Sequence, residues 1–142
     1  MLEANWEEAT HDQVVDVIGN YLNANETRFV IWETDTPSPP RTRGIQDGER
    51  VLRPDVLGVD WLGNRAVGII EVETASTALT DLAQWQDYDS IAERHNCEFV
   101  LIVPEGYGSF VKGSCRLAGL KRLSGVLSYS VSPIGKVTLA RC

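Results

Sequence analysis

The chain lacks long apolar runs and has few cysteines and histidines, and each scarcity excludes a class of protein. No stretch of about 18 apolar residues occurs, so the sequence predicts no transmembrane helix and no membrane partner. The three cysteines follow no metal or redox spacing and the only histidines are His11 and His95, which disfavours an ordinary zinc site. The first residues also lack the basic and apolar regions of a signal peptide, so we expect a cytoplasmic protein.

What the chain does contain is typical of one globular domain over residues 1–142. Hydrophobic residues make up 43% and charged residues 23%, which is enough for an ordinary core. The net charge of −7 is unevenly spread, because residues 105–142 carry six basic residues against one acid, or +5, which leaves −12 for residues 1–104. This asymmetry indicates either an acidic site beside a basic binding surface or a mixed, solvated surface.

Hydrophobic periodicity and turn residues predict a series of helices and strands. We expect helices over residues 10–24, 78–95 and 109–123, and strands over residues 28–33, 51–62, 66–74, 98–103, 126–131 and 136–140. Thr10 is a candidate N-cap for the first helix. Residues 34–49, rich in Pro and Gly, are expected to form a long loop. This order predicts an α/β fold in which helices flank a mixed β-sheet.

Three carboxylates lie on two apolar strands that should be neighbours. Asp55 is on the first strand, and Glu71 and Glu73 are two residues apart on the next, so the two glutamates project from the same face. A carboxylate at the end of a buried strand is costly to desolvate unless a positive charge pairs with it. The acids therefore predict a site for Mg²⁺ or Mn²⁺, and the alternative is a solvated strand end whose acids pair with arginines.

The register of these strands decides whether the acids meet. A two-residue turn at Gly63 and Asn64 would place Asp55 opposite Val72, on the wrong face. A three-residue loop or one β-bulge would place it opposite Glu71. We expect the second register, because it aligns the apolar rows as well as the acids. A metal ion bound there would deprotonate a water and stabilise charge on a phosphate, so phosphodiester hydrolysis is the natural chemistry.

Three short motifs occur in a recognisable order: Pro54-Asp55, then Glu71-Val72-Glu73, then Gln84-Trp85-Gln86-Asp87-Tyr88. Over about residues 50–104 the chain thereby resembles the PD-(D/E)xK nuclease superfamily, in particular its RecB-like branch with a QxxxY motif. The resemblance implies a restriction-endonuclease-like fold and a Mg²⁺-dependent deoxyribonuclease, with an endonuclease favoured. It implies that Asp55, Glu71 and Glu73 carry the metal and the attacking water. Gln84 and Tyr88, on one face of the following helix, would orient DNA or another ligand.

Glu73 departs from the family pattern, which usually has lysine at this position. A glutamate cannot supply positive charge beside a phosphate, but it can act as a further metal ligand or as a base for water. Alternatively, Lys112 or Lys121 could reach the site from elsewhere. A third possibility is a catalytically degraded nuclease fold that serves as a DNA-binding or assembly module, and a fourth is an unrelated α/β domain.

DNA is the partner that the resemblance implies, and basic side chains would contact its phosphates. The candidates are Arg41, Arg43, Arg53, Lys112 and Arg116. A chain of net charge −7 should bind DNA with a strong dependence on salt. Family members of this size often act as dimers, so a homodimer is also expected.

Overall fold

The computed structural model describes residues 2–26, 28–36, 43–60, 62 and 64–142, with the side chains of the first helix described from Ala9 onward. The helices are α1 (Leu2–Ala24), the short 3₁₀ helix η1 (Thr77–Leu79), α2 (Leu82–His95) and α3 (Gly108–Ala118). The strands are β1 (Val30–Thr34), β2 (Ile45–Asp47), β3 (Arg50–Leu52), β4 (Val56–Asp60), β5 (Arg65–Val72), β6 (Glu98–Pro104), β7 (Leu123–Val131) and β8 (Val137–Arg141). In this part of the chain no helix is long and apolar enough to cross a membrane.

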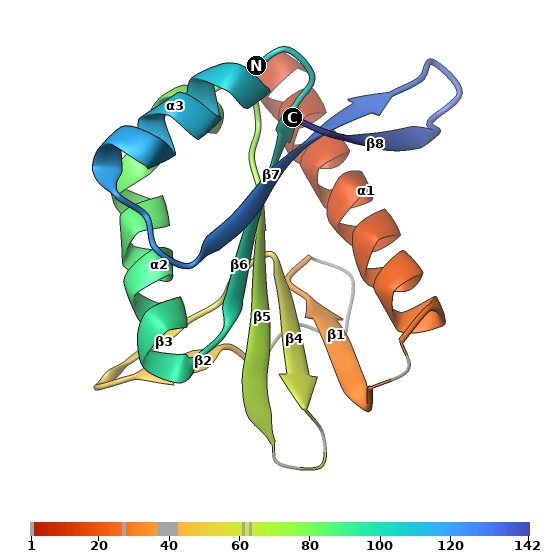
Figure 1. Ribbon diagram of the computed structural model, residues 1–142. Helices are drawn as coiled ribbons and strands as arrows, with labels where there is room; N and C mark the ends of the chain where they lie inside the picture. Colours follow the sequence, from red (N-terminus) through yellow and green to blue (C-terminus); the bar gives the residue numbers. More distant parts are fainter. Residues whose placement is uncertain (1, 27, 37–42, 61, 63) are drawn as a thin grey trace.

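Six strands form one mixed sheet in the order β1-β4-β5-β6-β7-β8 (Figure 1). β4 is antiparallel to β1 and to β5, whereas β6 runs parallel to β5 and β7 parallel to β6. The chain passes from β5 to β6 through α2 and from β6 to β7 through α3, because parallel neighbours need a long crossover. The predicted mixed α/β sheet flanked by helices is confirmed, and the carboxyl ends of β5, β6 and β7 meet at one edge.

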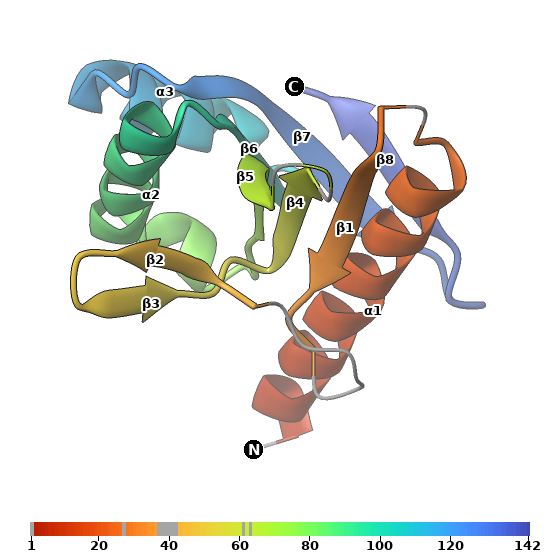
Figure 2. The same cartoon turned by 90° about the horizontal axis from the view of Figure 1, so that it is seen from below.

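The helices cover both faces of this sheet, with α1 on one side and α2 and α3 on the other (Figure 2). Val14, Val15 and Ile18 of α1 are buried against strand residues of the first face. Trp85 of α2 and Val111 of α3 are buried against the second face. Each helix buries one stripe because its apolar residues recur at spacings of three and four.

Two helix boundaries correct the sequence-based prediction. α1 begins at Leu2, well before the predicted start at Thr10, because residues 2–9 include good helix formers such as Leu, Glu and Ala. α3 ends at Ala118 and not at residue 123, because Gly119 adopts a left-handed conformation with φ of 71° and closes the helix.

The expected loop over residues 34–49 contains a strand, which also corrects the prediction. β2 pairs with β3 in a small separate hairpin. Two ion pairs attach this hairpin to α2: Arg50 Nη2 lies 2.7 Å from Asp87 Oδ1, and Arg94 Nη2 lies 2.8 Å from Asp47 Oδ2. A three-residue strand has too few residues to show a periodic pattern, so nothing local in the sequence marks it.

The register of β4 and β5 agrees with the expected one. Val56 lies opposite Ile70, so Asp55, one residue before β4, comes to lie beside Glu71. A β-bulge after Gly58 shifts the register farther along the pair and supplies the odd residue. This alignment is what places two carboxyl groups at the same end of the sheet.

Candidate functional site

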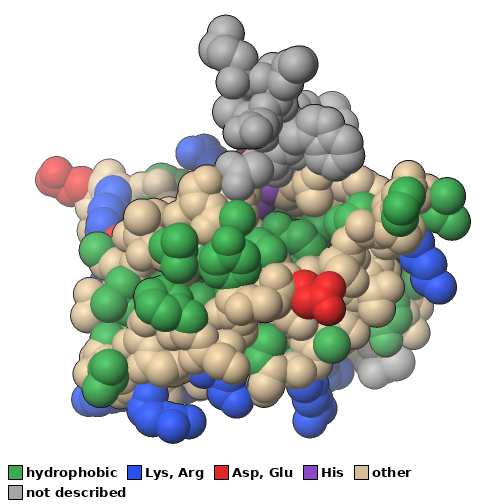
Figure 3. Space-filling view, turned by 90° about the horizontal axis from the view of Figure 1, so that it is seen from above, with side chains coloured by type: hydrophobic (Ala, Val, Ile, Leu, Met, Phe, Trp, Pro, Cys, Tyr) green, Lys and Arg blue, Asp and Glu red, His purple; other side chains and the backbone are tan. Residues whose placement is uncertain are grey.

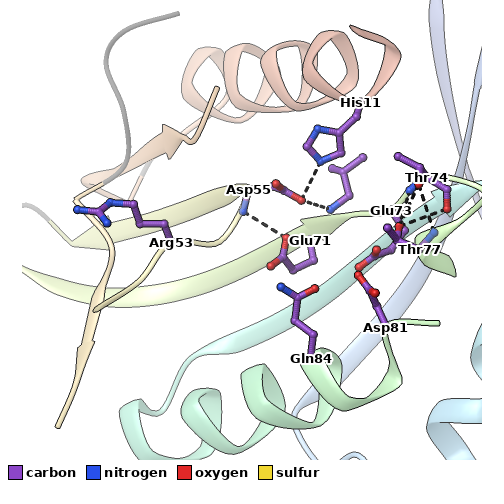
Figure 4. Close-up of a pocket in the computed structure, with 10 residues that line it drawn as sticks. His11, Arg53, Asp55, Glu71, Glu73, Thr74, Thr77, Asp81 and Gln84 are labelled. Atoms are coloured by element: carbon purple, nitrogen blue, oxygen red, sulfur yellow. Dashed lines mark hydrogen bonds and ion pairs between the residues drawn. The ribbon is translucent and has the colours of Figure 1, made fainter. Parts of the chain in front are cut away.

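The three predicted carboxylates line one cavity of about 370 Å³ near the carboxyl end of β5 (Figure 4). Its walls come from α1, the segment between β3 and β4, the end of β5, η1 and the start of α2. The lining residues are His11, Arg53, Asp55, Glu71, Val72, Glu73, Thr74, Thr77, Asp81 and Gln84.

Asp55 and Glu71 form the centre of this cavity. The backbone N–H of Asp55 donates to Glu71 Oε2 over 3.3 Å, and the N–H of Val72 donates to Asp55 Oδ2 over 2.8 Å. The Asp55 carboxylate thus accepts a backbone hydrogen bond where the ladder between β4 and β5 ends. The two carboxyl groups also shift each other's pKa, so the site places two acids side by side.

His11 of α1 is the cation that faces Asp55, with its Nε2 3.2 Å from Asp55 Oδ2. Burial alone would lower the pKa of His11, but the hydrogen bond and the charge of Asp55, with help from Asp12, raise it to about 9. Burial likewise would raise the pKa of Asp55, but the hydrogen bonds from His11 and Glu71 hold it below its ordinary value. His11 and Asp55 therefore form a partly buried ion pair at neutral pH.

Glu71 is in the opposite situation, because it is 5% exposed and has no cation of its own among the contacts that shift its pKa. Burial first, and then the charge of Asp55, raise the pKa of Glu71 well above its ordinary value. The Tyr88 hydroxyl forms a hydrogen bond with Glu71, and burial and the charge of Glu71 raise the pKa of Tyr88. The metal-free site thus favours a protonated Glu71 beside an ionised Asp55.

Glu73 points away from this pair and toward Asp81 (Figure 4). Its side chain is buried, and the Trp85 indole Nε1 donates to its Oε1 over 2.6 Å. Burial raises the pKa of Glu73, while hydrogen bonds from Thr77 and Trp85 oppose that rise. The acids of the cavity therefore fall into two pairs, Asp55 with Glu71 and Glu73 with Asp81.

The two residues of the QxxxY motif lie near the acids but in different environments. Gln84 is exposed, lines the cavity and points its amide toward Glu71 (Figure 4). Tyr88 is 4% exposed, and its hydroxyl is bound to Glu71. Of the two, Gln84 is the one that a ligand in the cavity could reach, whereas Tyr88 positions Glu71.

The predicted DNA-contacting cations are not gathered at this cavity. Arg53 lines it, but its guanidinium points away from Asp55 and Glu71 (Figure 4). Arg43 is bound to Glu33 at 2.8 Å. Lys112 and Arg116 line a separate hollow beside α3, and Arg41 falls outside the described residues. Neither Lys112 nor Lys121 lines the carboxylate cavity, so the structure does not bring either of them in to replace the missing lysine.

Five lining residues were not predicted as site residues from the sequence: His11, Val72, Thr74, Thr77 and Asp81. Thr77 and Asp81 follow the acidic strand closely, but nothing in their spacing marks them. His11 precedes Val15 by four residues and Ile18 by seven, so it continues the apolar stripe of α1. A histidine at a stripe position was the one available signal.

The donor groups of the cavity are compatible with the Mg²⁺ or Mn²⁺ that the sequence predicts. Within the described ranges, no three His, Cys, Asp or Glu side chains are grouped so as to hold a metal ion. Mg²⁺ does not require such a cage, because it is usually held by one or two carboxylates together with waters and substrate phosphates. The buried Asp55–Glu71 pair supplies two hard oxygen ligands and a proton that a cation would displace, so the donor chemistry fits.

Comparison of the chain with protein-family models, with curated proteins and with solved structures gave no match.

Proposed function

We propose that this chain is a metal-dependent DNA nuclease, with endonucleolytic hydrolysis of phosphodiester bonds favoured. The observation that carries the proposal is the pair of neighbouring carboxyl groups inside one cavity, with Glu71 buried, Asp55 partly buried, and the N–H of Asp55 donating to Glu71 Oε2. Two neighbouring ionised carboxylates repel each other, and His11 balances the charge of only Asp55. A divalent metal ion is the partner that would make both ionised forms favourable.

In this proposal Asp55 and Glu71 hold Mg²⁺ or Mn²⁺. The bound ion would polarise the scissile phosphate and lower the pKa of a water molecule. His11 keeps Asp55 ionised and oriented, and Tyr88 holds the carboxyl group of Glu71 in place. Gln84, exposed at the mouth of the cavity, orients the DNA.

In this proposal Glu73 acts as the general base and accepts the proton that the attacking water loses. Burial raises its pKa, which makes it a better proton acceptor than an ordinary glutamate. Asp81 lies on the same side of the cavity and is only partly buried, so this side of the cavity is open to water.

A catalytically inactive DNA-binding or assembly module is the second candidate. Two observations favour it. No lysine is found among the residues that line the described cavity, and the Glu73 carboxylate is already bound to Trp85 and Thr77.

Incubation with plasmid, single-stranded and branched DNA in Mg²⁺ or Mn²⁺ separates the two candidates. The nuclease should cleave at least one substrate, and Asp55→Asn or Glu71→Gln should reduce the rate by at least about 100-fold, because each removes a charged metal ligand. Glu105→Gln is the matched control, since this exposed acid lies outside the cavity and its loss should change the rate by less than about twofold.

The other outcomes are equally informative. Metal binding by calorimetry without cleavage of any substrate would favour the inactive module. Absence of metal binding at millimolar Mn²⁺ would contradict the proposed metal site and with it the nuclease. Cleavage that survives the Asp55 and Glu71 substitutions together would mean that the activity comes from elsewhere.

A further inference from the structure

The basic residues of the last third of the chain are not neutralised by acids. The structure pairs Arg28, Arg43, Arg50 and Arg94 with carboxylates. None of the six basic residues after residue 104 forms an ion pair with another described residue. Those six are Lys112, Arg116, Lys121, Arg122, Lys136 and Arg141. Lys112 Nζ donates a hydrogen bond to the backbone oxygen of Cys142 over 2.9 Å. This part of the surface is therefore positively charged, with no described Asp or Glu paired to it, on a chain whose net charge is −7.

Three of these cations surround two adjoining hollows beside α3 and β7, which we name the basic groove. One hollow, of about 300 Å³, is lined by Lys112 and Arg116, and the other, of about 460 Å³, by Lys112 and Arg141. Both are also lined by Ser124 and by the backbone at Gly125. No Asp or Glu is among the lining residues of either hollow.

The basic groove is distinct from the carboxylate cavity. The two share no lining residue. β6 lies between β5, which carries Glu71, and β7, which lines the groove. In Figure 3, Lys and Arg side chains gather along the lower margin of the molecule, and no Asp or Glu side chain is visible among them.

We propose that the basic groove binds the phosphate backbone of nucleic acid and is the main surface by which this protein holds it. Lys and Arg side chains that no Asp or Glu neutralises attract a polymer of regularly spaced negative charges and gain affinity by releasing its counterions. Lys112 and Arg116 are four residues apart on α3, so they project on the same side of the helix. The choice of nucleic acid rests on the proposed nuclease function.

An acidic protein segment is less favoured as the partner. Protein interfaces depend on aromatic or other large apolar anchors in central pockets. The lining of the groove includes no Trp, Tyr or Phe, and its apolar members are aliphatic: Val100, Leu120, Leu123, Val126 and Leu127. Among the described residues, the metal-free carboxylate cavity offers phosphate no free cation beside Asp55 and Glu71, because His11 is already paired with Asp55 and Arg53 points away. A nucleic acid therefore needs a separate basic surface on this acidic chain, and the groove provides one.

Binding of fluorescein-labelled single-stranded and duplex DNA, measured by anisotropy in EDTA over a series of salt concentrations, tests this proposal. The double variant Lys112→Ala with Arg116→Ala should bind at least about tenfold more weakly at low salt, and its log–log salt slope should fall by about two. The control Arg65→Ala with Lys136→Ala makes the same change of charge outside the groove and should weaken binding less than about twofold.

Equal losses in the two double variants, or no loss in either, would overturn the groove as the binding surface. So would absence of DNA binding combined with tight binding of poly-glutamate, which would identify an acidic protein partner. Because the measurement is made without metal, it is separate from cleavage. Metal-free DNA binding that depends on the groove, without any cleavage, would support this proposal while contradicting the nuclease.

Discussion

At the scale of single residues, the pKa values of two neighbouring acids in one cavity are shifted in opposite directions, that of Asp55 downward and that of Glu71 upward. Asp55 has His11 and the N–H of Val72 as partners, so its ionised form is stabilised in spite of burial. Burial and the charge of Asp55 both disfavour the ionised form of Glu71, so its neutral form is favoured. Asp55 is therefore the acid that stabilises the metal-free fold, and Glu71 is the one whose ionisation destabilises it.

Glu71→Gln should stabilise the metal-free protein at neutral and alkaline pH. Between the ordinary pKa of a glutamate and the raised pKa of Glu71, the folded state binds more protons than the unfolded state, so the free energy of unfolding falls as pH rises. Glutamine cannot ionise and avoids that loss, which amounts to about 1.4 kcal/mol for each pKa unit of the shift. Urea unfolding in EDTA, at a series of pH values from acid to alkaline, measures the difference in stability between the wild type and Glu71→Gln.

The difference between wild type and Glu71→Gln should vanish near and below the ordinary glutamate pKa, where both side chains are neutral. Glu105→Gln, at an exposed position, should show no such dependence on pH. A constant loss of stability in Glu71→Gln at every pH would mean instead that the ionised carboxylate serves a structural pair.

Residue-scale reasoning from the sequence identified Asp55, Glu71 and Glu73, because alternation along a strand is a local property. It did not identify the partners of these acids. Trp85 reads as a core residue of an amphipathic helix, and its indole N–H on Glu73 follows only from the crossing of α2 over β5. Whether Glu73 is a base or a structural acid depends on that contact.

At the scale of elements, Trp32 of β1 explains how the hairpin of β4 and β5 tolerates two glycines opposite each other. Gly58 and Gly68 are direct partners across these strands. A Cβ at Gly58 would lie 2.7 Å from the Trp32 ring, and one at Gly68 would lie 2.9 Å from it. The ring thus fills the space that two side chains would occupy, and the indole N–H is bound to Glu26.

Gly58→Ala should destabilise the protein by about 1–3 kcal/mol, because the rigid indole ring must move to admit the methyl group. Gly113→Ala in α3 is the matched control, since a Cβ there meets nothing within 4 Å and alanine should stabilise the helix by up to about 1 kcal/mol. Urea unfolding compares the two. The loss of unfolding free energy caused by Gly58→Ala should be smaller in a Trp32→Leu background. An equal loss in that background would mean that the clash is not with the Trp32 ring.

At the scale of the whole molecule, the fold separates charge into an acidic cavity and a basic groove on different strands. The cavity needs α1 from one face of the sheet and α2 from the other, since His11 and Gln84 approach the same acids from opposite sides (Figure 4). The groove needs α3, β7 and β8. A metal ion in the cavity would therefore bind only the folded state and should stabilise the whole domain.

Mg²⁺ or Mn²⁺ should raise the Tm, and the gain should be larger at about pH 8 than at about pH 5.5, because metal must displace the proton that burial holds on Glu71. A concentration 100 times the Kd corresponds to about 2.7 kcal/mol of stabilisation. Thermal unfolding with and without metal measures the gain. The variant carrying both Asp55→Asn and Glu71→Gln should show none, and an equal gain in that variant would place the metal at another site.

The α/β class, most helices and strands, and the alignment of Asp55 with Glu71 could be inferred from the sequence, because hydrophobic periodicity and the matching of apolar rows in a hairpin are local properties. It could not reveal the β2–β3 hairpin, which ion pairs attach to α2. The contact of His11 with Asp55, the hydrogen bond of Trp85 to Glu73 and the separation of Lys112 and Arg116 from the acids became evident only in the folded structure. These contacts join segments distant in the chain, and their geometry follows from how the helices cross the sheet.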